Sequence, residues 1–198
     1  MKIPFYFDYA CPWAYLGSTR VESYFADLGV EIDFRPVRLA DLVENPGEKR
    51  GLPPGERRRA WYVADLNAWA ELVGADFELT AGGRRPDTRL LCQAALVAQD
   101  HGHFREFHYP AYRARWAEGR AVDEAEVVGE LLEGAGLDAD AALAEARSDA
   151  CATRLDATTR EAIERGVFGV PTLFVGERML FGNDRFELAR HFVQKQAL

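Results

Sequence analysis

The chain of 198 residues lacks the features that mark several classes of protein. It has only three cysteines, a small and odd number that argues against a disulfide framework. No apolar run approaches the roughly 18 residues that a membrane-spanning helix needs. Basic residues are in the minority, with 24 Lys and Arg against 32 Asp and Glu and a net charge of −8. These absences argue against membrane insertion and against binding to nucleic acid.

The first residues also lack the pattern of a secretory signal. Residues 1–4 lead directly into a strand pattern, without an apolar segment or a small-residue cleavage site. We therefore expect a cytoplasmic protein in a reducing environment. The one basic run, residues 57–59, lies in an acidic surround and is expected to be a solvated helix face.

Both ends of the chain have the pattern of an α/β protein. The predicted elements are a strand, helix and strand over residues 3–9, 12–28 and 30–37, then a helix, hairpin and helix over 152–165, 170–175, 179–181 and about 184–196. Strand, helix and strand at this length form a βαβ unit, which predicts parallel strands. We expect the C-terminal hairpin to join the same sheet, since it cannot bury its own face.

The middle of the chain shows no convincing strand. Helices are predicted there over residues 57–74, 87–101, about 103–117, 123–134 and 138–150. Clusters of Gly, Pro and Asn at residues 45–47 and 51–55 mark the loops before this region. We predict a discontinuous α/β domain of residues 1–45 and 151–198, with residues 46–150 as an inserted all-helical domain.

A cysteine stands where the first helix is expected to begin. Cys11 follows an aromatic strand, and Pro12 is a favourable first helical residue because its missing N–H costs nothing there. Unpaired N–H groups and the helix dipole at this end favour a thiolate. In a dithiol redox site a second cysteine would follow Trp13, but this chain has Ala14. The sequence therefore predicts a reactive site with one sulfur instead of two.

Four segments together resemble the DsbA-like branch of the thioredoxin superfamily. They are residues 5–17, 60–70, 166–172 and 179–185. Within this branch the chain looks most similar to 2-hydroxychromene-2-carboxylate isomerases and kappa-class glutathione transferases. The resemblance implies a thioredoxin-like α/β fold with an inserted helical domain. It also implies glutathione or another low-molecular-weight thiol as cofactor, no metal, and a homodimer.

The resemblance further implies a binding site for a thiol peptide. Pro171 is expected to follow a cis peptide bond, so that Val170 can present its N–H and C=O to an extended peptide such as glutathione. Asn183 is expected as the N-cap of the last helix, and with Asp184 it would hold the γ-glutamyl end. An ordinary strand-entry proline and simple helix capping are the alternative interpretations of these residues.

Cys11 occupies the position where the isomerase and kappa families usually carry serine, whose hydroxyl hydrogen-bonds the glutathione sulfur. Three hypotheses follow. In a glutathione-dependent isomerase the bound thiolate adds to an enone, the bond rotates and the thiolate leaves, with Cys11 as its polar partner. In a monothiol oxidoreductase of the DsbA family, Cys11 itself forms mixed disulfides. The third hypothesis is a binding module that holds an extended segment along the cis-proline edge.

The inserted helices are expected to form a lid over an apolar pocket for a small organic substrate. Candidate walls are Trp61, Trp69 and Trp116, although tryptophans at such spacing are more often part of a core. The isomerase pattern usually has asparagine after the proline that opens the third helix, whereas here Asp87 follows Pro86. An ionised Asp87 would repel the carboxylate of an aromatic keto-acid.

The remaining cysteines and the clustered histidines are not expected to carry chemistry. Cys92 and Cys151 lie on helical patterns and are interpreted as small core residues. His101, His103 and His108 have no carboxylate or cysteine at a recognisable metal-ligand spacing. We interpret these histidines as residues of solvated helix ends.

Overall fold

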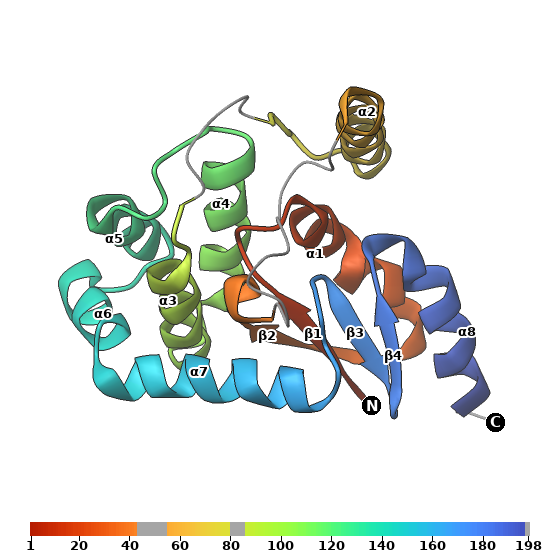
Figure 1. Cartoon of the computed structure of the whole chain (residues 1–198). Coiled ribbons are helices and arrows are strands. Elements are labelled where there is room, and N and C mark those ends of the chain that lie inside the picture. Colours follow the sequence, from red (N-terminus) through yellow and green to blue (C-terminus); the bar gives the residue numbers. More distant parts are fainter. Residues whose placement is uncertain (43–54, 80–85, 197–198) are drawn as a thin grey trace.

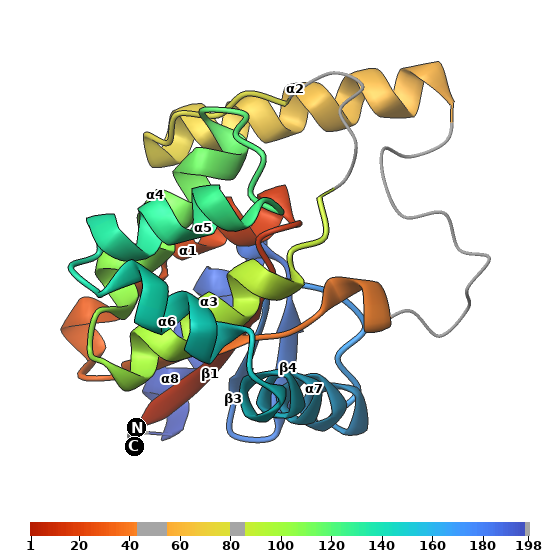
Figure 2. The same cartoon turned by 90° about the vertical axis from the view of Figure 1, so that its left-hand side faces the viewer.

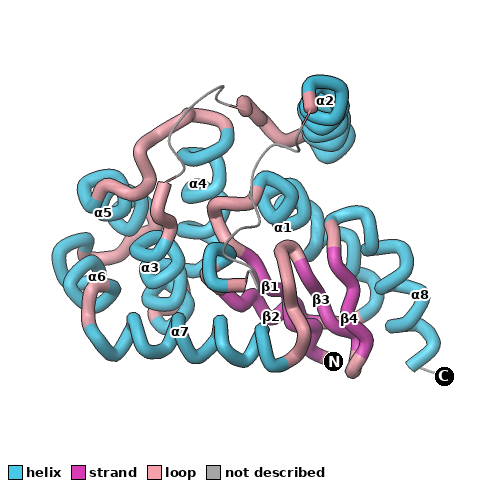
Figure 3. The backbone as a smooth tube through the Cα atoms, in the orientation of Figure 1, coloured by secondary structure: helices cyan, strands magenta, loops and turns pink. Residues whose placement is uncertain are grey.

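The computed structural model describes residues 1–42, 55–79 and 86–196, in which four strands form one mixed sheet (Figure 3). The strands are β1 (Lys2–Phe7), β2 (Glu31–Pro36), β3 (Thr172–Val175) and β4 (Arg178–Phe181), in the order β2-β1-β3-β4. β1 and β2 are parallel, whereas β1–β3 and β3–β4 are antiparallel. The predicted parallel βαβ unit and the addition of the hairpin to its sheet are both confirmed.

Helices cover both faces of this sheet (Figure 1). α1 (Pro12–Phe25) and α8 (Phe186–Gln196) lie together on one side, and α7 (Asp149–Glu164) lies on the other. Because β1 is covered on both faces, it is a nearly continuous apolar run in which Phe5, Tyr6 and Phe7 are fully buried. A short 3₁₀ helix, η1 (Ala26–Leu28), extends α1 as far as Gly29, where the chain turns into β2.

The described residues in the middle of the chain form helices and loops without a strand. Its helices are α2 (Glu56–Val73), α3 (Arg89–Asp100), α4 (Phe104–Trp116), α5 (Ala125–Gly134) and α6 (Ala139–Ala146). α3 to α6 form a group beside β2, and α2 runs separately across the top of the molecule, next to α1 (Figure 2). The three arginines at residues 57–59 are exposed, as predicted. Within the described ranges, no helix combines the length and the apolar composition needed to cross a bilayer.

One hydrophobic core runs from the sheet into the helical region. It includes Phe5 of β1, Leu16 of α1, Leu91 of α3, Tyr112 of α4 and Leu155 of α7. The α/β fold with a helical insertion is therefore confirmed. The predicted boundary between residues 45 and 46, with the loop residues 45–47 and 51–54, lies outside the described residues. The division into two domains stays a prediction.

The junction at the end of the insertion differs from the prediction. Helices were expected over 138–150 and 152–165, but α6 ends at Ala146 and α7 begins at Asp149. The cause is Ser148, whose hydroxyl accepts a hydrogen bond from the Cys151 N–H at 3.2 Å and caps α7. Ser148 followed by an acidic residue is a helix-start signal that the apolar spacing concealed.

Candidate functional site

Cys11 is the N-cap residue of α1, directly before Pro12 at the first helical position. Its own N–H donates to the Asp8 carbonyl at 3.1 Å, and its carbonyl accepts from Tyr15 N–H at the same distance. The residue is 7% exposed, so its thiol lies just below the surface. The helix dipole and the first N–H groups of α1 are therefore directed toward the region of the Cys11 sulfur.

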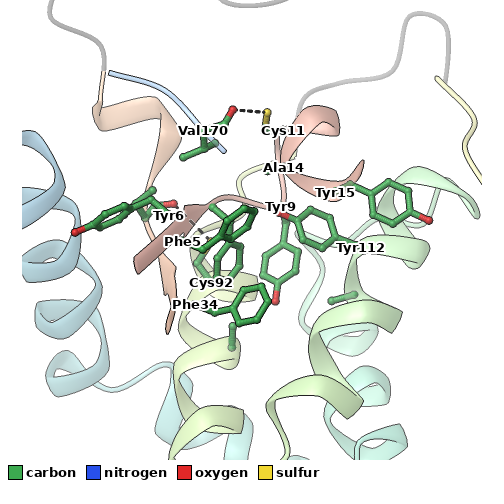
Figure 4. Close-up of a cluster of buried hydrophobic side chains, with 14 of the residues drawn as sticks. Phe5, Tyr6, Tyr9, Cys11, Ala14, Tyr15, Phe34, Cys92, Tyr112 and Val170 are labelled. Atoms are coloured by element: carbon green, nitrogen blue, oxygen red, sulfur yellow. Dashed lines mark hydrogen bonds between the residues drawn. The ribbon is translucent and has the colours of Figure 1, made fainter. Parts of the chain in front are cut away.

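The cysteine thiol contacts the loop that enters β3. Cys11 Sγ donates a hydrogen bond to the Val170 carbonyl at 3.1 Å (Figure 4), and the Val170–Pro171 peptide bond is cis. A serine hydroxyl in place of Cys11 is also a donor for this carbonyl. The geometry thus accepts either side chain at position 11 without losing the contact.

The loop around Pro171 is held from two sides. The Pro171 carbonyl accepts from Gly182 N–H at 2.9 Å, and Thr172 Oγ1 donates to the Gly169 carbonyl at 2.8 Å. On α1, a Cβ placed at Gly17 would lie 3.4 Å from Pro171 Cγ. α1 therefore lies next to this loop at Gly17.

Gly17 also lies next to the predicted segment that contains Asn183. A Cβ at Gly17 would lie 3.6 Å from the Asn183 Cβ. The structure therefore brings Cys11, Val170, Pro171 and Asn183 together around α1, from segments more than 150 positions apart in the chain.

The prediction that Asn183 is an N-cap is wrong. Residues 183–185 form a short 3₁₀ helix, η3 (Asn183–Arg185), before α8, and its N-cap is Gly182 with φ 112°. Asn183 is buried, and its Nδ2 has no hydrogen-bond acceptor among the described residues. Asp184 is exposed and pairs with Arg185 at 2.6 Å. A glycine at Gly182 is required because side chains rarely adopt this positive φ.

Arg20 is a site residue that the sequence patterns did not reveal. Its Nη2 donates to the Asn183 carbonyl at 2.5 Å. The guanidinium carbon lies 4.5 Å from the ring centre of Phe186 and 5.0 Å from that of Trp69. Burial lowers the pKa of Arg20, but arginine remains protonated in proteins. The cation therefore fixes η3 against α1 while aromatic faces replace part of its hydration.

Asp8 is a second residue that was missed. Its carboxylate is 2% exposed and accepts from Ala10 N–H at 2.8 Å, from Leu39 N–H at 2.6 Å and from Thr88 Oγ1 at 2.6 Å. Burial raises the pKa of Asp8, while these hydrogen bonds and nearby Arg38 act in the opposite direction. The sequence signal for Asp8 is its place directly after the buried aromatic residues 5–7, where a carboxylate needs hydrogen-bond partners.

The two predicted substrate residues lie in different surroundings. Trp61 is 65% exposed on α2. Asp87 accepts from Arg89 N–H at 3.0 Å, and its carboxylate lies 3.6 Å from Arg38 Nη2. The predicted repulsion of a substrate carboxylate by Asp87 is therefore offset, because an arginine stands beside it.

The other two tryptophans are held by the protein itself. Trp116 is buried and donates its indole N–H to the Tyr9 carbonyl at 2.9 Å. Trp69 is half-buried against Arg20. α2 reaches the start of α1 through Tyr62, whose ring lies 5.7 Å from that of Trp13. A hollow of about 710 Å³ lies along β2 and is lined largely by charged residues, with none of the predicted site residues among them.

Cys92 and Cys151 are buried thiols, as predicted. Burial raises the pKa of both, and for Cys92 the neighbouring Asp8 carboxylate adds to the effect. Thiols that resist ionisation are poor nucleophiles.

The prediction that the three histidines are solvated is wrong for His108. Its ring is fully buried among aromatic side chains, with Nδ1 3.0 Å from the Tyr9 hydroxyl, and burial holds its pKa well below the ordinary value. His101 is exposed and meets Glu145 at 3.0 Å. In residues 1–42, 55–79 and 86–196 no group of three or more His, Cys, Asp or Glu side chains is placed to hold a metal ion.

The fold and the site define a class: a thioredoxin-like protein with a single cysteine at a helix N-terminus, in contact with the residue before a cis proline. A family model described as a DSBA-like thioredoxin domain matches residues 2–194. The chain belongs to this family. A 2-hydroxychromene-2-carboxylate isomerase of Pseudomonas sp. (strain C18) is 32% identical over 197 residues, with 96% of this chain and 89% of that protein covered.

Solved structures show the same relationship. A 2-hydroxychromene-2-carboxylate isomerase structure has a TM-score of 0.85 and 28% identity, with 100% of this chain and 96% of that chain covered. A probable DsbA oxidoreductase from Streptomyces coelicolor has a TM-score of 0.79 and 26% identity, with 98% and 89% covered. The chain is an enzyme of the isomerase or thiol–disulfide oxidoreductase type.

Proposed function

We propose that this enzyme is a glutathione-dependent isomerase of the 2-hydroxychromene-2-carboxylate isomerase type. The observation that carries the proposal is the hydrogen bond from Cys11 Sγ to Val170, at the N-terminus of α1 and beside the cis Pro171. Ala14 stands where a resolving cysteine would be needed, and Cys92 and Cys151 are buried with raised pKa values. These features favour a site that activates a bound thiol over one that exchanges an internal disulfide.

In this proposal, glutathione lies along Val170 and Pro171 with its sulfur near Cys11. Asn183 and Asp184 hold the γ-glutamyl end. Support comes from the Asn183 amide, whose Nδ2 has no acceptor among the described residues, and from the exposed Asp184 carboxylate, which suits an ammonium group. The helix N-terminus would stabilise the glutathione thiolate, and the Cys11 S–H, which donates to Val170 in the structure, would turn to the glutathione sulfur when glutathione binds.

The chemical step uses the thiolate as a temporary nucleophile. It adds to the β-carbon of an enone, and the carbon–carbon double bond becomes a single bond while the carbonyl becomes an enolate. After rotation the enolate re-forms the double bond and expels the thiolate, so glutathione is unchanged. Substrates of this type carry a carboxylate, for which Arg38 beside Asp87 supplies the positive charge.

The alternative function is a monothiol oxidoreductase of the DsbA family. The observation that favours it is the presence of a thiol, not a hydroxyl, at position 11. In that chemistry the Cys11 thiolate attacks the disulfide of oxidised glutathione, its S–S bond breaks, a Cys11–glutathione disulfide forms and one glutathione thiolate leaves. Without a second cysteine at position 14, a further external thiol must release the protein.

The substitution Cys11→Ser separates the two functions. The hydroxyl keeps the donor to Val170, so an isomerase should retain activity within about tenfold of the wild type. A monothiol oxidoreductase should lose all turnover, because serine forms no disulfide. The measurement is glutathione-dependent isomerisation of 2-hydroxychromene-2-carboxylate, followed by absorbance, alongside reduction of a mixed glutathione disulfide.

Cys92→Ser is the matched control, since it changes the same atom at a buried position. It should leave both activities near the wild-type level. Absence of isomerisation by the wild type, together with disulfide exchange that depends on Cys11, would replace the first function by the second.

We also propose that the enzyme is a cytoplasmic homodimer. None of the three cysteines, all of which lie in the described residues, forms a disulfide, which suits a reducing compartment. The dimer follows from the resemblance to the isomerase and kappa families, and sedimentation of the purified protein tests it. A monomer at micromolar concentration would contradict it.

A further inference from the structure

The Asp8 carboxylate connects three segments that meet at the candidate site. Oδ1 accepts from Ala10 N–H, in the turn that leads to Cys11. Oδ2 accepts from Leu39 N–H, in the segment after β2 that leads toward the inserted helices. Oδ1 also accepts from the hydroxyl of Thr88, where the chain enters α3. One buried side chain therefore joins the Cys11 turn to the segment after β2 and to the start of α3.

The role of Thr88 shows that this arrangement is specific. Thr88 is the N-cap residue of α3, where a threonine hydroxyl ordinarily accepts a hydrogen bond from its own helix. Here the hydroxyl makes no capping bond and donates to Asp8 at 2.6 Å instead. The first turn of α3 thus gives up its side-chain cap in favour of the contact with Asp8.

The main chain of Asp8 strengthens the same connection. Its carbonyl accepts from Cys11 N–H at 3.1 Å and from the Tyr112 hydroxyl of α4 at 3.2 Å. The orientation of Cys11 at the start of α1 therefore depends on Asp8 through both its backbone and, by way of Ala10, its side chain.

The groups that face Asp8 favour its ionised form. Three donors reach the two carboxylate oxygens at 2.6 to 2.8 Å, and the Cys92 thiol of α3 lies 3.9 Å from Oδ1. Arg38, in the segment after β2, is the nearby cation. Tyr9 and Tyr112 are the other titratable groups around it, and burial raises the pKa of both. A neutral amide cannot accept all these hydrogen bonds, because its NH₂ group would face an N–H donor.

We propose that Asp8 is a positioning residue, which uses the Thr88 hydroxyl and the Ala10 N–H to hold Cys11 in its productive orientation at the N-terminus of α1. The inference rests on the proposed function in one respect only: Cys11 is the residue that assists the thiol chemistry. The positioning effect is opposite in sign to the electrostatic effect of the Asp8 charge. A negative carboxylate near Cys11 opposes a thiolate, so removal of the charge alone would favour the thiolate.

The test is the pH profile of Cys11 alkylation by iodoacetamide, measured by mass spectrometry of the peptide that contains Cys11. Thr88→Val removes the hydroxyl and keeps the shape of the side chain, whereas Thr88→Ser keeps the hydroxyl and removes the methyl group. Asp8→Asn removes the charge and one acceptor. Val193→Ala, a buried change in α8, is the control for a general loss of stability, and the thermal midpoint of each variant is measured in parallel.

Positioning predicts that Thr88→Val and Asp8→Asn both move the midpoint of the alkylation profile to higher pH, by about half a unit, because Cys11 loses its alignment with the helix N-terminus. Thr88→Ser and Val193→Ala should leave the midpoint unchanged. An unchanged midpoint for Thr88→Val, or a midpoint moved to lower pH for Asp8→Asn, would overturn the proposal. If Asp8→Asn does not fold, Thr88→Val against Thr88→Ser decides alone.

The alkylation profile needs neither glutathione nor the organic substrate. If the wild type fails to isomerise 2-hydroxychromene-2-carboxylate, the proposed function is contradicted while the profile still measures the effect of Asp8 on Cys11. If isomerisation is found and Thr88→Val changes neither the profile nor kcat, the positioning role alone is contradicted.

Discussion

Two cysteines show how differently the molecule treats the same side chain. Cys11 is the N-cap residue of α1, and its thiol donates to the carbonyl of Val170. Cys92 lies inside α3, fully buried, and its thiol is 3.9 Å from both the Asp8 carboxylate and the Val37 carbonyl. Figure 4 shows the Cys11 sulfur at the edge of the aromatic cluster and Cys92 within it. Position on the helix and access to solvent therefore decide which thiol is available for chemistry.

The difference extends to the other titratable groups. Asp8, Cys92 and His108 lie in the interior beneath Cys11. Burial raises the pKa of Asp8 and Cys92 and lowers that of His108, which favours the neutral form of each. Cys92 and His108 therefore stay neutral, whereas the ionised form of Asp8 depends on its N–H and O–H donors and on Arg38. The N-terminus of α1 is the place where an added negative charge meets unpaired N–H groups.

The largest expected effect comes from removing the thiol of Cys11, the member of this pair at the start of α1. Cys11→Ala deletes the S–H donor proposed to act on the glutathione thiolate and should lower isomerisation by about 100-fold or more, as the loss of a charge-stabilising donor does. Cys92→Ala should lower the unfolding free energy by roughly 1 kcal/mol and leave kcat near the wild type. Steady-state kinetics and denaturant unfolding of both variants provide the measurement. Equal losses of kcat would remove the distinction between the two thiols.

A second cysteine at the helix start should change the chemistry of the site. In Ala14→Cys the new thiolate can attack a Cys11–glutathione disulfide, release glutathione and form an internal disulfide. The protein loses two hydrogens while oxidised glutathione is reduced to two molecules of glutathione. Mass spectrometry after exposure to oxidised glutathione should show the glutathione adduct in the wild type and the internal disulfide in the variant. An adduct that persists in Ala14→Cys would mean that α1 does not present position 14 to Cys11.

The buried interior should respond to acid through His108. Because its folded-state pKa is lowered, the unfolded chain binds a proton below about pH 6.5 that the folded chain does not. The unfolding free energy should therefore keep its full value above about pH 6.5 and fall by about 1.4 kcal/mol per pH unit below that pH. His108→Gln keeps a partner for the Tyr9 hydroxyl and removes the titration. Denaturant unfolding between pH 7 and 5 should give a flatter dependence for this variant, and parallel curves would rule out His108 as the cause.

The smallest effect on stability is expected for Trp61, which is exposed on α2. Trp61→Ala should change the unfolding free energy by no more than about 0.5 kcal/mol, because the side chain is 65% exposed. If Trp61 covers the organic substrate, KM should rise by about fivefold, which corresponds to the roughly 1 kcal/mol of a lost aromatic contact. Arg57→Ala, an exposed change on the same helix, is the control. An unchanged KM would remove Trp61 from the substrate site.

Much of the architecture followed from the sequence because its signals are local. The βαβ unit, the hairpin and the helical insertion each have a clear apolar period and glycine or proline boundaries. The resemblance to a known family then placed Cys11 beside the Val170–Pro171 pair, although Val170 is 159 positions away from Cys11. The apolar periodicity of the sequence alone does not predict that contact.

The missed residues share a different property, since each acts through the tertiary fold. Asp8, Arg20 and Thr88 look like ordinary polar residues in the sequence, and their partners come from distant segments. His108 was misplaced because its helix begins near solvent while its own ring faces the aromatic core. Such roles depend on burial and on three-dimensional neighbours, which short-range spacing does not encode.

The most direct test of the account compares the alkylation rates of the three cysteines in the native protein at pH 7.5, with and without glutathione. We expect Cys11 to react about 100-fold faster than Cys92 or Cys151, because Cys11 is the N-cap residue of α1, whereas burial raises the pKa of the other two thiols. Saturating glutathione should then protect Cys11 or form a mixed disulfide with it. Similar rates for all three cysteines, or a Cys11 rate that glutathione leaves unchanged with no adduct formed, would contradict the central claim that the N-terminus of α1 is a thiol-binding site.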